Sequence, residues 1–228
     1  PRVSWLMTDI DLHAEVAVLC RNRDLCPDTV RPLFERQIGF QYIPESYFPA
    51  CTVEDGALWL HGHRYTAVLG DKALFPDAAH PEVSALEPDC RCDPPQPMLR
   101  CASFNKEGRA CWLLVNEGNT PIKTRLTLPV DAPLCRYDLW NGQPCACPAE
   151  RTAKGACLPL ELPARGSLLL FTCTARESEA LPLPPTYLSL AAPAFTLADE
   201  DAAHLTKTYR ATLQITATEL QTATPLLT

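Results

Sequence analysis

The chain of 228 residues lacks any apolar run near the roughly 20 residues that a membrane-spanning helix needs. Residues 1–20 also lack the basic, apolar and small-residue succession of a secretory signal peptide. The sequence therefore predicts no membrane partner. The chain is 46% hydrophobic, so it can still bury a real core. Because it opens with Pro1 rather than Met, we expect a fragment or a processed chain.

Basic residues are too few for some classes of partner. There are 20 Lys and Arg against 27 Asp and Glu, which gives a net charge of −7. Nucleic acids and anionic membranes recruit clustered Lys and Arg. We therefore exclude nucleic acid and expect neutral molecules or other proteins as partners.

Cysteine, by contrast, is abundant, with 12 residues. A small secreted domain would use them as a disulfide frame, but a chain of this length does not need one. Several stand at strand positions where a small apolar residue would serve. We therefore expect mostly free thiols and a reducing, cytoplasmic compartment. Since the number is even, a secreted, disulfide-linked protein remains the alternative.

The first 85 residues mix strand and helix signals. Residues 15–22 form a nearly continuous apolar run, as in a strand buried on both faces of a parallel sheet. Because a proline removes a backbone donor, a helix that contains Pro32 can be regular only if its regular part begins near that residue. The further elements that we expect are a helix, a strand, a short helix and two strands: 28–37, 39–43, 45–48, 57–60 and 65–69. This order predicts an abbreviated α/β module over 1–85.

The proline-rich segment 86–97 cannot continue a helix or a central strand, so we place a linker there. Residues 98–175 predict an antiparallel β-sandwich. Ile122, Leu126 and Leu128 alternate with polar residues and share one face. The run 168–171 is apolar on both faces, as in a central strand.

A second linker is expected over 176–185, where prolines favour an extended chain. The remaining residues, 186–228, predict an additional β element. Residues 187–197 would pair with the alternating strand at 209–215 across the acidic turn 199–201. Two strands alone are marginal in water, so this element would pack on the sandwich or belong to a larger domain.

Two groups of segments resemble parts of glycoside hydrolases. The β-sandwich that follows the catalytic barrel in many bacterial glycoside hydrolases is similar to residues 112–118, 122–128, 137–142 and 158–171. The flavodoxin-like, β-galactosidase-trimerisation-like domain of α-L-rhamnosidase-like hydrolases resembles residues 16–20, 38–46 and 54–71. Soon after Asp71 the sequence departs from that pattern, so the resemblance implies a truncated flavodoxin-like module. Residues 186–228 resemble the start of a galactose-binding-like jelly roll.

The resemblance also implies that the catalytic acids belong to a barrel that precedes these modules. Glycosidases need two carboxylates about 5–9.5 Å apart. The acidic residues that qualify by type are Glu45, Glu54, Asp55, Glu117 and Asp138. Asp55 and Glu117 lie beside glycines in turns, where a capping role is the simpler interpretation. We therefore assign no catalytic residue.

A sugar offers an apolar face and hydroxyl edges, which an aromatic platform beside hydrogen-bonding side chains would bind. Trp140 beside Asn141, together with Tyr137, is the platform that we expect for carbohydrate contact. Each of these aromatic rings would serve equally well in the core.

Two Cys-x-Cys pairs stand in proline-bordered segments: Cys90 with Cys92, and Cys145 with Cys147. Together they would offer four thiolates to zinc, but structural zinc sites use Cys-x₂₋₄-Cys spacing. We therefore expect no metal and no cofactor, with these four cysteines as the metal candidates.

These observations favour a non-catalytic accessory region of a glycoside hydrolase-like protein. It would support the catalytic barrel of a parent chain, self-associate, or contact a neutral carbohydrate. The alternative is a free-standing binding or adaptor module, secreted and disulfide-linked. A small cysteine-dependent enzyme would need one unusually reactive thiol.

Overall fold

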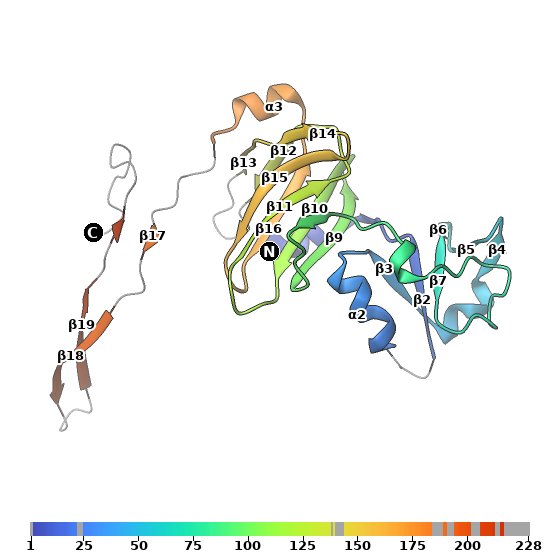
Figure 1. The fold of residues 1–228 in the computed structure, drawn as a ribbon, viewed down its shortest axis with the longest axis horizontal. Helices are drawn as coiled ribbons and strands as arrows, with labels where there is room; N and C mark the ends of the chain where they lie inside the picture. The colour runs from blue at the N-terminus through green and yellow to red at the C-terminus, as the bar shows by residue number, and fades with distance from the viewer. Residues whose placement is uncertain are drawn as a thin grey trace. The chain divides into compact units, whose positions relative to one another are not determined.

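The computed structural model describes residues 2–21, 25–137, 139, 144–183, 189–190, 194–201, 206–212 and 215–216 (Figure 1). The chain forms two compact units, Pro1–Leu183 and Pro184–Thr228. The first unit contains an α/β module and a two-layer β-sandwich. Among the described residues, no helix is long and apolar enough to cross a membrane.

One layer of the sandwich is a six-stranded antiparallel sheet with the order β1-β9-β10-β16-β12-β13. Its strands are β1 (Asp11–Leu12), β9 (Leu99–Lys106), β10 (Arg109–Asn116), β12 (Leu134–Tyr137), β13 (Pro144–Cys147) and β16 (Ser167–Thr172). The other layer has the order β14-β15-β11-β8. Its strands are β8 (Arg91–Asp93), β11 (Ile122–Leu128), β14 (Glu150–Thr152) and β15 (Gly155–Leu162). Apart from β1, which is blue, the strands of the two layers are drawn in green to orange in Figure 1.

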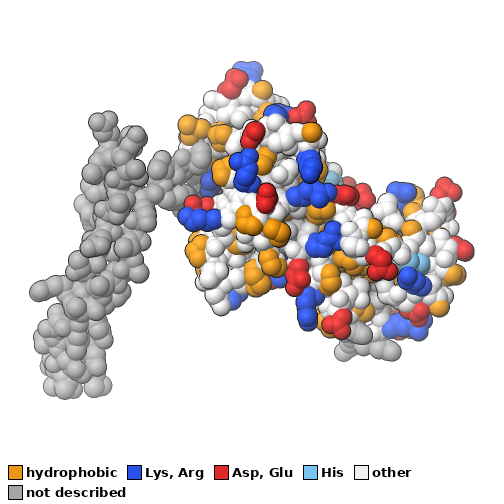
Figure 2. Space-filling model, viewed as in Figure 1, with side chains coloured by type: hydrophobic (Ala, Val, Ile, Leu, Met, Phe, Trp, Pro, Cys, Tyr) orange, Lys and Arg blue, Asp and Glu red, His pale blue; other side chains and the backbone are white. Residues whose placement is uncertain are grey.

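Side-chain alternation builds the core between the layers. Along β11, Ile122, Leu126 and Leu128 are buried, while Lys123 and Arg125 are exposed. This confirms the predicted face. Lys123 reaches across to Glu161 of β15 at 2.7 Å. On the face shown in Figure 2, basic and acidic side chains of the described residues are interspersed.

The α/β module contains a three-stranded parallel sheet with the order β3-β2-β7. Its elements are β2 (Val16–Cys20), α2 (Pro27–Glu35), β3 (Phe40–Pro44) and β7 (Ala67–Leu69). All five residues of β2 are buried, as predicted for a strand covered on both faces. Helix α2 forms the crossover between β2 and β3 and buries Val30 and Leu33. The 3₁₀ helix η1 (Glu45–Ala50) and the antiparallel strands β4 (Thr52–Glu54), β5 (Ala57–Leu60) and β6 (His63–Tyr65) complete the module.

The predicted fold class, α/β followed by all-β, is therefore confirmed, whereas the flavodoxin-like character of the module remains a prediction. Two local predictions were wrong. Helix α2 begins at Pro27 and contains Pro32, because its nine residues leave few internal hydrogen bonds for a proline to remove. The strand expected over 65–69 is two strands in different sheets, since the Thr66 amide turns aside to donate to the Glu15 carbonyl at 2.8 Å.

The segment that joins the α/β module to the sandwich contains a strand of the sandwich. β8 lies within the expected linker 86–97, at an edge of the four-stranded sheet, and the 3₁₀ helix η2 (Val83–Ala85) precedes it. From the other end, β1 pairs with β9 of the sandwich. The limits 1–85, 86–97 and 98–175 remain predictions. The structure adds helix α1 (Arg2–Met7) before β1 and helix α3 (Ala175–Ala180) at the start of the expected second linker.

In the second unit, β18 (Ala194–Asp201) pairs with β19 (Thr206–Thr212), and β17 (Ser189–Leu190) pairs with β20 (Ile215–Thr216). The predicted additional β element is therefore present. The expected acidic turn is not a turn, because Asp199 to Asp201 are paired with Thr208 to Thr206 within the strands.

Candidate functional site

Strand β16 gives the six-stranded sheet apolar side chains on both of its faces. Leu168 and Leu170 point into the core between the layers. Leu169 and Phe171 alternate with them and belong to a separate cluster on the outer face. The buried members of that outer cluster are Leu6, Phe104, Cys111 and Leu169. The outer face of an antiparallel sheet is normally polar when it faces water. Because this outer face is apolar, we infer that other groups cover it.

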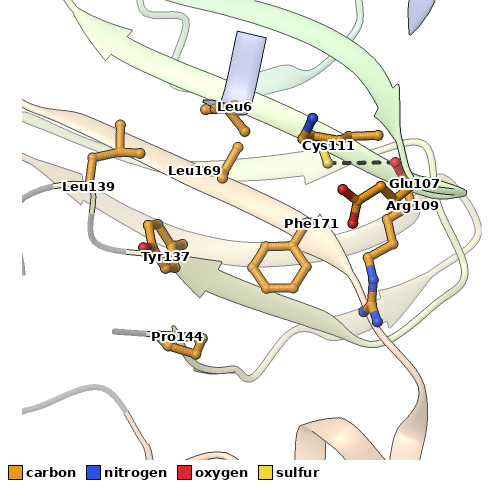
Figure 3. Close-up of a pocket in the computed structure, with 10 residues that line it drawn as sticks. Leu6, Glu107, Arg109, Cys111, Tyr137, Leu139, Pro144, Leu169 and Phe171 are labelled. Atoms are coloured by element: carbon orange, nitrogen blue, oxygen red, sulfur yellow. Dashed lines mark hydrogen bonds between the residues drawn. The ribbon is translucent and has the colours of Figure 1, made fainter. Parts of the chain in front are cut away.

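Helix α1 covers only part of it, and a pocket of about 500 Å³ remains beside Leu6. The pocket is lined by Leu6, Lys106, Glu107, Arg109, Cys111, Tyr137, Leu139, Pro144, Leu169 and Phe171. In Figure 3 the rings of Tyr137 and Phe171 lie over the sheet on one side of the pocket, with Leu169 and Leu6 beyond them. The Arg109 side chain runs past Phe171 at one end.

Arg109 is held in place by several partners. Its guanidinium donates to both carboxylate oxygens of Glu177, at 2.6 and 3.2 Å, and to the Thr172 carbonyl at 3.3 Å. It also lies 5.9 Å from the centre of the Phe171 ring. A guanidinium that makes two hydrogen bonds to one carboxylate has a fixed orientation. The pocket therefore has a cation of fixed position at its rim.

Glu177 is fixed from its other side by α3. Its carboxylate accepts from the Thr174 amide at 2.8 Å, and its own amide donates to the Thr174 hydroxyl, a capping box. The hydrogen bonds from Arg109, and then those from Thr174, lower the pKa of Glu177 to about 2. This carboxylate is therefore ionised at neutral pH and unsuited to act as a general acid.

Lys106 is a buried polar residue in the pocket wall. Its ammonium donates to the Thr8 carbonyl at 2.8 Å, directly after α1. A buried ammonium requires such partners. Lys106 therefore holds the segment that carries Leu6 against the sheet.

Cys111 is the one thiol among the described residues that line this pocket. Burial raises its pKa above the ordinary value, and its thiol donates to the Arg109 carbonyl at 3.5 Å. No histidine is among the described lining residues. A thiol whose pKa is raised and that has no histidine beside it is a poor nucleophile.

Of the three residues expected to contact carbohydrate, Tyr137 lines the pocket, while Trp140 and Asn141 lie outside the described residues. The sequence analysis missed Phe171 and Arg109. The strict alternation along 168–171 could have placed Phe171 on the outer face. The contact of Arg109 with Glu177 spans 68 residues and has no local sequence signal.

The acidic residues considered for catalysis are dispersed. Glu45 begins η1 and Glu54 ends β4, while Asp55 occupies the following turn at φ 49°. Glu117 pairs with Arg100 at 2.8 Å. None of these four lines the pocket, and Asp138 lies outside the described residues.

The two Cys-x-Cys pairs lie in different sheets, since Cys92 is on β8 whereas Cys145 and Cys147 are on β13. Cys90, just before β8, contacts Cys101 of β9. Strand β13 is four places from β9 in the six-stranded sheet, and each place adds about 4.8 Å. In the described part of the chain, no group of three His, Cys, Asp or Glu side chains could hold a metal ion.

A larger hollow of about 850 Å³ lies between the α/β module and the sandwich. Some of its polar side chains are already engaged with the protein. Asp89 accepts from the Ser103 hydroxyl at 2.7 Å, and His63 contacts the Ala14 carbonyl at 2.9 Å. This hollow is better described as a polar junction than as a binding site.

No family model matches the chain, and no curated protein matches it. Among solved structures, the chain is similar to a rhamnosidase from Novosphingobium sp. PP1Y, with 11% identity and a TM-score of 0.54. The match covers 80% of this chain and 24% of the rhamnosidase chain, so this chain spans about a quarter of that length. At this identity the likeness concerns the fold.

Two further structures share smaller parts. Alpha-galactosidase I from Mortierella vinacea has 21% identity and a TM-score of 0.27, over 40% of this chain and 25% of the galactosidase chain. Beta-galactosidase from Bacillus circulans sp. alkalophilus has 17% identity and a TM-score of 0.24, over 40% of this chain and 10% of the other.

Proposed function

We propose that this chain is a non-catalytic accessory region of a glycoside hydrolase-like protein, whose sandwich offers a contact surface to neutral carbohydrate beside a catalytic barrel. The observation that carries the proposal is the pocket on the outer face of the six-stranded sheet, with two aromatic rings and a fixed guanidinium. The fold likeness to a rhamnosidase, over a quarter of that chain, supports it.

The chemistry of the pocket suits a sugar. The rings of Tyr137 and Phe171 can pack against the apolar face of a pyranose, and the Arg109 guanidinium and the Tyr137 hydroxyl can bond its hydroxyl groups. Such a shallow contact, with few polar partners, gives weak binding, with a dissociation constant on the order of 1 mM.

Bond cleavage requires more than this pocket provides. A glycosidase needs a protonated carboxyl and an ionised one across the scissile bond. Glu107 is the one carboxylate among the described lining residues. Nearby Glu177 is held ionised by Arg109. The catalytic step is therefore assigned to a barrel outside this chain.

The test combines two measurements on the purified chain. We expect aryl glycosides, among them the rhamnoside and the galactoside, to hydrolyse no faster than in buffer. Titration with rhamnose and galactose, followed by NMR, should show saturable shifts that Tyr137→Ala weakens at least 5-fold, roughly 1 kcal/mol. Tyr47→Ala removes an exposed tyrosine of η1 and should leave the binding unchanged. Enzymatic turnover, or equal binding by the Tyr137 variant, would refute the proposal.

A further inference from the structure

The Cys90 thiol has two thiol neighbours at one edge of the sandwich, those of Cys101 and Cys92. Cys90 belongs to the buried core cluster, and Cys92 and Cys101 pack against that cluster. Cys92 is on β8 of the four-stranded sheet, whereas Cys101 is on β9 of the six-stranded sheet. The group therefore spans the two layers.

The neighbouring residues fix this approach independently. Asp89 accepts from the Ser103 hydroxyl at 2.7 Å, which anchors the chain just before Cys90 to β9. The Asp89 amide also donates to the Gln37 carbonyl at 2.9 Å. Further along, Cys92 is held in register opposite Leu126 of β11. Cys90 is thus fixed from both sides next to Cys101.

We propose that Cys90 and Cys101 form an oxidative modification site, in which a disulfide joins the two layers of the sandwich when a disulfide oxidant such as glutathione disulfide is present. The proposal goes beyond the accessory function and does not depend on it. Cys90, Cys92 and Cys101 are thiols in the structure, which therefore shows this group in its reduced form.

The reaction balances as two thiol–disulfide exchanges. The Cys101 thiolate attacks one sulfur of glutathione disulfide, forms a mixed disulfide and releases the first glutathione. The Cys90 thiolate then attacks the Cys101 sulfur, closes the protein disulfide and releases the second. Cys101 is the entry point because it is partly exposed, whereas Cys90 is 1% exposed.

A disulfide between Cys90 and Cys92 would close a loop with only Arg91 inside it and would leave the two layers unjoined. The pKa values of the Cys90 and Cys92 thiols are both raised, in each case first by a hydrogen bond between thiols. Cys101, which is partly exposed, is therefore the thiol that reacts first with the oxidant.

Trypsin distinguishes every pairing, because Arg91, Arg100 and Lys106 separate the three cysteines into peptides 73–91, 92–100 and 101–106. The folded chain is incubated with glutathione disulfide, alkylated with iodoacetamide, digested and analysed by mass spectrometry without reduction. We expect peptide 73–91 linked to 101–106. A link between 92–100 and 101–106, a stable glutathione adduct without a cross-link, or full alkylation of both cysteines would overturn the proposal.

Stability gives a second readout. A short closed loop between the layers should raise the melting temperature of the oxidised chain by about 5–10 °C. Cys101→Ser should abolish both the linked peptide and this rise, whereas the matched variant Cys92→Ser should keep both. The peptide map of the wild-type chain decides the question even if a variant folds poorly. A rise of equal size in oxidised Cys101→Ser would refute the assignment.

Discussion

Asp89 accepts a hydrogen bond from the Ser103 hydroxyl at 2.7 Å and thereby joins the segment before β8 to the sandwich strand β9. The same carboxylate packs against Gly39 of the α/β module. A Cβ atom on Gly39 would come within 2.7 Å of the Asp89 carboxylate and 2.8 Å of the His13 carbonyl. The module and the sandwich therefore approach closely at Gly39, which has no side chain to keep them apart.

Substituting Gly39 tests this close approach. We expect Gly39→Ala to lower the free energy of unfolding by about 1–3 kcal/mol, because the added methyl group displaces Asp89 or the backbone at His13. Urea denaturation measures it. Because the two residues are in contact, Gly39→Ala with Asp89→Ala should cost at least roughly 0.5 kcal/mol less than the sum of the single variants. Strict additivity would contradict the contact.

Asp89 should also affect how stability depends on pH. Burial raises the pKa of its carboxyl above the ordinary 3.8, despite the opposing hydrogen bonds from Ser103 and Gly39. Nearby His13 lowers this pKa and Glu15 raises it. The folded state thus binds the proton more tightly than the unfolded state, so ionisation weakens the fold as pH rises through the folded pKa.

The corresponding variant is Asp89→Asn, which stays neutral. Between about pH 4 and 7, the difference in urea midpoint between wild type and variant should move in favour of the variant as pH rises. Asp131→Asn, whose parent side chain is 93% exposed, is the control and should show no such trend. A trend in the opposite direction would mean that Asp89 is stabilised as the anion.

Glu177 should have the opposite effect, because the stability that it supplies is lost as the pH falls. Its pKa is lowered to about 2 by Arg109, and then by Thr174, from the ordinary 4.5. The stability that its ionised form supplies is complete above pH 4.5 and is lost as pH falls through 2. Melting temperatures between those two values should therefore fall more steeply for the wild type than for Glu177→Gln. Glu179→Gln, an exposed site on the same helix, should follow the wild type.

The outer face of the six-stranded sheet should behave as a second core. Leu170 faces the inner core and is 0% exposed, while Leu169 faces the outer cluster and is 5% exposed. We expect Leu170→Ala and Leu169→Ala each to cost about 2–5 kcal/mol in unfolding free energy. Leu183→Ala, at 70% exposed, should change it by less than about 0.5 kcal/mol. A negligible cost at Leu169 would mean that this face is ordinary solvent-facing surface.

The local sequence pattern was sufficient to predict the strands in which burial follows a regular pattern along the chain. Strand β11 alternates buried and exposed side chains, β2 is buried throughout, and β16 is apolar on both faces, each as its sequence predicts. A period of two residues fixes which side chains share a face. The same pattern does not identify the neighbouring strand. It therefore left out the pairing of Leu12 with Phe104, which brings β1 into the sandwich.

The candidate site depended on contacts between distant segments. Amino-acid type alone drew attention to Tyr137 and to the cysteines, but not to Phe171, nor to the way Arg109 is fixed by Glu177. Chain composition and alternation determined an α/β module followed by a β-sandwich. Tertiary packing alone decided that the six-stranded sheet has an apolar outer face with a pocket, and that Cys90 meets Cys101 across the layers. The reason is that burial is encoded residue by residue, whereas the partner of each buried side chain is set by how the sheets close on one another.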